Sequence, residues 1–143
     1  MKKIICLVVV VLMIAAVAIA AKKMKIAEKD LPGLKGTWEG ILSFGVSEQG
    51  ATSPVKLEIL NDKVPVKAKL TITNVPNIVA TQFGDTGGQK VAEFDDGIIT
   101  SQGTLMWTGP AKNFFEVTLA GEKKLEVWYY FRGMKGDATL KKK

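Results

Sequence analysis

The acidic side chains that stand closest together in this sequence are Glu93, Asp95 and Asp96, beside Gly97. Two carboxylates can act as general acid and general base when they face one cleft and their pKa values differ. Here they fall at a predicted turn, where water keeps carboxylates ionised. A calcium loop would need more oxygen ligands at regular spacing. We therefore interpret the acidic cluster as turn chemistry.

The sequence has few of the residues that nucleophilic catalysis and metal binding require, because it contains no histidine and a single cysteine, Cys6. Histidine is the usual partner of a catalytic serine and a common metal ligand. No Gly-x-Ser-x-Gly turn, the motif that exposes a nucleophilic serine, occurs in the sequence. We expect a protein that is not an enzyme and that carries no metal and no cofactor.

The first residues carry the marks of a secretory signal. Lys2 and Lys3 precede an apolar stretch over Ile4–Ala21, and Ala18 and Ala20 provide the small pair that a signal peptidase requires. We therefore predict export to the periplasm or the extracellular space, with residues 1–20 removed. An alternative stays open, because 18 apolar residues can also span a membrane. The chain would then be held in the inner membrane by residues 4–21.

The positive charge lies at the two ends of the chain. The whole sequence carries a formal charge of +6, but residues 36–140 hold ten basic and twelve acidic side chains, a net charge of −2. We expect residues 21–35 to be a charged spacer, 36–140 a single domain and 141–143 a basic tail. A nucleic-acid-binding protein should carry its basic patch on the domain, so we do not expect nucleic acid as a partner. Membrane contact is expected only through an uncleaved N-terminal segment.

The domain reads as short β-strands without a helical period after residue 35. The clearest alternation runs from Val66 to Thr73, where apolar residues alternate with lysines and threonines. Asp95-Asp96-Gly97 is typical of a hairpin turn. This spacing predicts an all-β antiparallel meander of eight or nine strands, with a barrel favoured over a β-sandwich. The expected strands are Gly36–Val46, Pro54–Leu60, Val66–Thr73, Ile78–Phe83, Gln89–Phe94, Ile98–Trp107, Asn113–Leu119, Lys124–Arg132 and Asp137–Lys141.

Gly36-Thr37-Trp38, at the start of the first strand, resembles the Gly-x-Trp signature of the lipocalins and the wider calycin group. In those barrels the tryptophan closes one end, and an arginine near the last strand packs across it. Arg132 is the only arginine of the chain and stands in the penultimate strand. The resemblance implies an up-and-down barrel that holds a small apolar molecule, with Trp38 and Arg132 as the pair that closes it.

Aromatic residues are the candidates for ligand contact. In Leu125–Arg132 one face is apolar, and the other combines aromatic with charged side chains, as expected for a strand that lines a cavity or a shallow groove. Aromatic rings also suit stacking against sugars. The alternative is that they form cross-strand packing pairs. The residues that we nominate as ligand contacts are Trp107, Phe114, Trp128 and Tyr130.

Two functions follow as hypotheses. The first is an exported β-barrel that binds a small apolar or amphipathic molecule. The second is a structural or interaction protein of the cell envelope whose barrel is filled by its own side chains, as is common for barrels of about eight strands. The identity of a ligand and the oligomeric state stay open.

Overall fold

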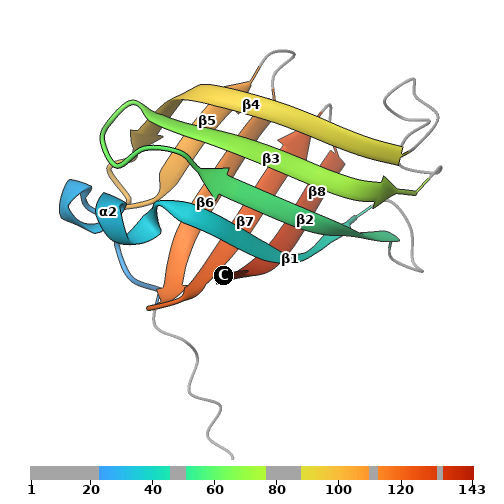
Figure 1. The fold of residues 1–143 in the computed structure, drawn as a ribbon, viewed down its shortest axis with the longest axis horizontal. Coiled ribbons are helices and arrows are strands. Elements are labelled where there is room, and N and C mark those ends of the chain that lie inside the picture. Colours follow the sequence, from blue (N-terminus) through green and yellow to red (C-terminus); the bar gives the residue numbers. More distant parts are fainter. Residues whose placement is uncertain (1–22, 46–50, 77–87, 110–112, 132–133) are drawn as a thin grey trace, which may run out of the picture.

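A computed structural model describes residues 23–45, 51–76, 88–109, 113–131 and 134–143. Eight antiparallel strands follow one another in sequence order and close into a barrel, with the first strand paired to the last (Figure 1). The predicted all-β fold, an antiparallel meander closed into a barrel, is therefore confirmed. The strands are β1 Gly36–Phe44, β2 Ala51–Ile59, β3 Val66–Val75, β4 Gly88–Ile99, β5 Leu105–Gly109, β6 Asn113–Gly121, β7 Lys124–Phe131 and β8 Met134–Lys142.

These strands form because apolar residues recur at every second position. In β2 the side chains of Val55, Leu57 and Ile59 are buried, while those between them are partly exposed. Successive side chains of a strand point to opposite faces of the sheet, so this pattern places one apolar face inside the barrel. The additional strand that we expected at Ile78–Phe83 lies outside the described residues.

The prediction of a hairpin at Asp95-Asp96-Gly97 is wrong. β4 continues through these residues to Ile99, and the chain turns over Thr100–Thr104 instead. The register between β3 and β4 shifts here, since Val66 pairs with Gly97 whereas Ala68 pairs with Phe94. Between these two pairs β4 advances by three residues while β3 advances by two, so β4 carries one extra residue, which is the geometry of a β-bulge.

Gly97 is required at this bulge by a neighbouring side chain. A methyl group at Gly97 would overlap Nε1 of Trp107 and would lie 2.6 Å from the carbonyl oxygen of Val66. These are the two atoms of a buried hydrogen bond, in which Trp107 Nε1 donates to Val66 O at 2.7 Å. A glycine is therefore needed here because the indole ring of Trp107 packs against its backbone, and not because the chain makes a tight turn.

The described part of the segment expected to be a charged spacer, residues 23–35, packs onto one end of the barrel instead. It forms a short 3₁₀ helix, Glu28–Asp30, and the helix α2, Leu31–Leu34. Ile26, Leu31 and Leu34 are buried, and Ile26 N donates to Gly103 O at 2.8 Å. We call this end of the barrel the α2 end and the opposite end the far end. The three apolar side chains explain the docking, because they bury surface that a spacer would leave in water.

The C-terminal lysines also belong to the folded structure. β8 extends to Lys142, which pairs with Trp38 in the register of β1 and β8. Lys143 lies 2.9 Å from a carboxylate oxygen of Glu39. The C-terminus therefore lies next to the start of β1, which follows α2 directly in the chain. The expected basic tail is largely the end of a strand.

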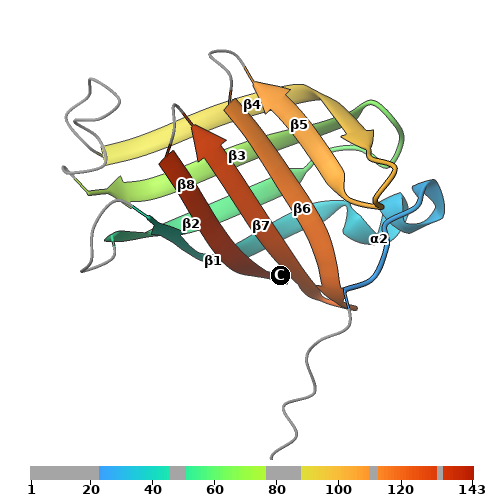
Figure 2. The same cartoon turned by 180° about the vertical axis from the view of Figure 1, so that it is seen from behind.

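The largest fully buried side chains include Trp38, Trp107 and Phe115, each 0% exposed. The ring centroids of Trp107 and Phe115 are 5.3 Å apart, and Phe115 also stacks with Phe94. Aromatic packing of this kind fills space at the density of an organic crystal. β5, β6, β7 and β8 lie side by side over this core (Figure 2).

Candidate functional site

Trp107 is part of the core and is separated from the other three nominated residues. Its side chain is completely buried, and its indole N–H is bound to Val66 O. A ligand could reach this ring only by displacing the packing around it. Trp107 therefore acts as a structural residue in this barrel.

Phe114, Trp128 and Tyr130 lie together on the outer face of the barrel. Phe114 pairs with Tyr130 across β6 and β7, and their rings stack with centroids 5.1 Å apart and planes 20° apart. Trp128 precedes Tyr130 by two residues on β7, so both side chains project from the same face. The indole of Trp128 remains 48% exposed. Three of the four nominated residues are thus brought together, outside the barrel rather than within it.

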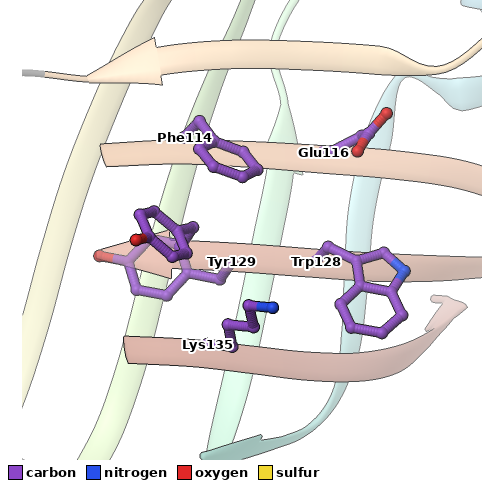
Figure 3. A pocket seen from close by; sticks show the side chains of 6 residues that line it. Phe114, Glu116, Trp128, Tyr129 and Lys135 are labelled. Carbon is purple, nitrogen blue, oxygen red and sulfur yellow. The ribbon is translucent and has the colours of Figure 1, made fainter. Parts of the chain in front are cut away.

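These rings border a shallow cavity of about 200 Å³, which we call the aromatic groove. Figure 3 shows Phe114, Glu116, Trp128 and Lys135 around it, on three neighbouring strands. The lining residues are Phe114, Glu116, Trp128, Tyr129, Tyr130 and Lys135.

Two charged residues of the aromatic groove were not among the nominated residues. Glu116 stands two residues after Phe114, so the period of the strand could have placed it on the same face. Lys135 lies in a stretch that we expected to be a connection, but that forms the start of β8. The Glu116 carboxylate accepts a hydrogen bond from the Thr104 hydroxyl at 2.6 Å, which fixes it at the edge of the groove.

A second cavity of about 380 Å³, the N-terminal groove, adjoins the aromatic groove and shares Glu116 and Trp128 with it. Its other wall comes from residues 23–25 and from residues 102–104. The N-terminal segment is held there by the hydrogen bond from Met24 N to Leu119 O, 2.8 Å long. Lys23 also approaches Glu126 to 3.2 Å. Trp128 therefore stands where two grooves meet.

The cation that the structure places over Trp38 is Lys142. Its Nζ atom lies 5.5 Å from the centre of the indole and donates to the carbonyl oxygen of Gly33. The indole N–H of Trp38 donates to Leu34 O at 2.8 Å, so strand β1 and helix α2 are tied together. Arg132, the arginine of the predicted closing pair, lies outside the described residues. Its pairing with Trp38 stays a prediction.

Polar side chains also face inwards at the far end of the barrel. Tyr129 follows Leu125 and Val127 on the inner face of β7, and burial raises the pKa of its phenol from 10.0 to about 12. The side-chain oxygen of Asn113, at the start of β6, is buried and has no hydrogen-bond partner among the described residues. The core is thus more polar at this end than at the α2 end.

Residues with catalytic potential are not assembled into a reactive group in the part of the chain that the structure describes. Ser53 and Lys56 have the Ser-x-x-Lys spacing of some serine enzymes, but an odd separation on a strand turns them to opposite faces. Ser53 Oγ donates to Asn74 O at 3.2 Å, and Lys56 pairs with Glu58 at 3.2 Å. Asp96 accepts hydrogen bonds from the backbone and the hydroxyl of Thr108.

Among the described residues, no three side chains of the types that ligate metals lie close enough to hold an ion. No described helix is long and apolar enough to span a membrane.

Fold and site together define a closed, eight-stranded antiparallel barrel with an outward-facing aromatic groove. Comparison with models of protein families, with curated proteins and with solved structures gave no match.

Proposed function

We propose that this protein is an exported, non-enzymatic β-barrel that binds a small amphipathic molecule in the aromatic groove. The observation that carries the proposal is the meeting of Phe114, Trp128 and Tyr130 in one cavity on the outer face. A half-exposed indole beside two stacked rings is apolar surface that a ligand can remove from water. Glu116 and Lys135 add polar groups that can orient the bound molecule.

The packing at the α2 end favours a site on the outside of the barrel. Trp38 occupies the interior there, Trp107 and Phe115 fill the barrel further along, and helix α2 with Ile26 covers the opening. Apolar ligands bind where apolar surface is accessible, and the aromatic groove on the outer face offers such surface. Export is supported by the N-terminal sequence, with its basic start, apolar stretch and small pair at Ala18 and Ala20.

We further propose that the barrel is lipocalin-like. The support is Trp38 at the start of β1, a short helical segment before it and a cation, Lys142, over its ring. This arrangement supports the resemblance carried by Gly36–Trp38, with a lysine as the cation that is described over the ring. The ligand position differs, because the nominated rings Phe114, Trp128 and Tyr130 face outwards.

A second candidate function is supported by the same core. A barrel filled by Trp38, Trp107 and Phe115 suits a structural or interaction protein of the envelope without a small ligand. On that account the groove rings stabilise the sheet as cross-strand pairs, each worth about 0.2–1 kcal/mol.

The distribution of the three tryptophans provides a direct test. Trp38 and Trp107 are 0% exposed and Trp128 is 48% exposed, so a small aqueous quencher such as acrylamide should act chiefly on Trp128. We would titrate the purified protein with lauric acid and with 1-anilinonaphthalene-8-sulfonate and record quenching. Saturable protection of Trp128 is expected. The variant Trp128→Phe should lose the quenched fraction, which assigns the signal.

A matched control is Ile98→Ala, since Ile98 is similarly exposed, at 47%, but lies on β4 away from the groove. This variant should bind the probes as the wild type does. Binding that is equally strong in Trp128→Ala would place the ligand elsewhere and contradict the proposed site. If no small molecule, neither an amphipathic probe nor a neutral polar one, gives saturable protection, the structural alternative is the correct one.

A further inference from the structure

We propose that the ligand of the aromatic groove is an uncharged oligosaccharide, with one sugar ring stacked on Trp128 and its hydroxyls bonded to Glu116 and Lys135. This inference rests on the proposed function and names the chemical class of the ligand.

The first argument is the shape of the aromatic surface. Trp128 and Tyr130 project from the same face of β7 two residues apart, about 6.6 Å along the strand. Phe114 stacks with Tyr130 and extends the surface onto β6. Phe114 and Tyr130 cover one face of each other, so the aromatic face that is open to a ligand is that of Trp128, which is 48% exposed. A cage around a cation would need several rings that face one point. A single open ring face beside a stacked pair suits a flat ligand with an apolar face, as a pyranose has.

The second argument is the polar rim. A carboxylate offers about four lone-pair positions, and the Thr104 hydroxyl uses one at Oε1 of Glu116, so the carboxylate can still accept bonds from a ligand. Lys135 supplies an ammonium group with three N–H donors. Glu116 pairs with Trp128 from β6, and Lys135 pairs with Tyr130 from β8. An acceptor and a donor on the two strands that flank β7 match hydroxyl groups, which both donate and accept. An aliphatic ligand would offer neither charged group a hydrogen-bond partner.

The third argument is charge. The lining of the aromatic groove contains one carboxylate, Glu116, and one ammonium, Lys135. Asp137 is the cross-strand neighbour of Trp128 on β8. Glu126 precedes Trp128 by two residues on β7. The three acidic side chains around the indole are matched by three lysines, Lys23, Lys25 and Lys135, and Lys23 pairs with Glu126 at 3.2 Å. The two grooves therefore carry little net charge with which to attract an anionic lipid surface, which favours a neutral ligand over a fatty acid or a membrane.

The fourth argument is length. The N-terminal groove continues from Trp128 and Glu116 towards Lys23 and Lys25, and it is the larger of the two cavities, with about 380 Å³ against about 200 Å³. A ligand that crosses Trp128 can thus extend in both directions. This favours a chain of several sugar rings over a monosaccharide.

The experiment uses uncharged trisaccharides, namely cellotriose, maltotriose and chitotriose, with the purified full chain. Binding is measured by isothermal titration calorimetry and by protection of Trp128 from acrylamide. At least one trisaccharide should bind saturably and protect Trp128. Trp128→Ala should weaken binding at least about tenfold, as expected when a central ring of a binding site is truncated. Ile98→Ala should leave binding unchanged.

Glu116→Leu tests the polar rim separately from the rings. It should weaken trisaccharide binding while leaving Trp128 as accessible to acrylamide as in the wild type. Glu116→Gln keeps an acceptor oxygen and should restore most of the affinity. If both variants bind as the wild type does, Glu116 has no role in recognition and the proposed arrangement is wrong.

The other outcomes separate this inference from the proposed function. If lauric acid or 1-anilinonaphthalene-8-sulfonate protects Trp128 and no trisaccharide does, the oligosaccharide inference is overturned while the binding function stands. If phosphatidylglycerol vesicles protect Trp128 and no trisaccharide does, the surface faces a membrane and the inference is again overturned. If none of these probes acts on Trp128, both proposals fail.

Discussion

Replacing Gly97 by alanine should destabilise the barrel far more than its small size suggests. The added methyl group would overlap Trp107 Nε1 and approach Val66 O to 2.6 Å, so either the indole or the strand must move. Overpacking of a core costs about 1–3 kcal/mol. Loss of the Trp107–Val66 hydrogen bond leaves buried polar groups unpaired, at about 1–3 kcal/mol. Together these give about 2–6 kcal/mol for Gly97→Ala.

Urea unfolding followed by circular dichroism measures this loss as a change in the free energy of unfolding. Gly33→Ala is the matched control, because a methyl group at Gly33 meets nothing within 4 Å. Since alanine favours helix over glycine, this control should be unchanged or more stable by up to about 1 kcal/mol.

A double-mutant cycle identifies the atom responsible. In the Trp107→Phe background the indole N–H is gone, so the further loss caused by Gly97→Ala should be smaller than in the wild type. Coupling between residues in contact is typically about 0.5–3 kcal/mol. A Gly97→Ala protein that unfolds within about 0.5 kcal/mol of the wild type would refute the reasoning, since such differences are typical of exposed sites. Strictly additive effects of the two substitutions would refute it as well.

Three further predictions concern the inner tyrosine, the α2 end and the N-terminus. Because burial raises the pKa of Tyr129 from 10.0 to about 12, the folded state holds this proton longer than the unfolded state. Its contribution to stability is complete below about pH 10 and is lost as the pH rises towards about 12. Urea unfolding across this pH range should show a falling free energy of unfolding in the wild type and a smaller fall in Tyr129→Phe. Lys142→Met removes the cation over Trp38 and the hydrogen bond to Gly33 O. This variant should lower the free energy of unfolding, measured by urea unfolding, by about 0.5–2 kcal/mol. An unchanged free energy of unfolding would mean that the cation does not stabilise the α2 end. Intact mass spectrometry of the exported protein should give a chain that starts at Ala21, and retention of residues 1–20 would favour the anchored alternative.

The strands were predictable where one face meets the core and the other meets water. The alternation in Val66–Thr73 and in Leu125–Arg132 depends only on neighbours along the chain, and the structure buries Leu70, Leu125 and Val127 as that period requires. The same period placed Trp128 and Tyr130 on a mixed face opposite the apolar one. Half of the site was therefore visible in the sequence.

The remaining features depend on contacts between distant residues. Asp95-Asp96-Gly97 has the composition of a turn, and its role as a bulge follows from Trp107 and Val66, which approach it only in the folded barrel. Glu28–Asp30 and Leu31–Leu34 are too short to show a helical period. Trp107 resembled the other aromatic candidates in type, and only its position inside the barrel distinguishes it from Trp128.

The meander order of the barrel has a consequence for how the chain folds. Seven of its eight strand pairs join neighbours in the sequence, whereas β1 and β8 are about a hundred residues apart. Loop-closure entropy makes such a distant pairing slow to form, so we expect the β1–β8 seam to assemble last. Substitutions there, for example at Gly40, where a methyl group would overlap Thr139 O, should speed unfolding while leaving the folding rate nearly unchanged.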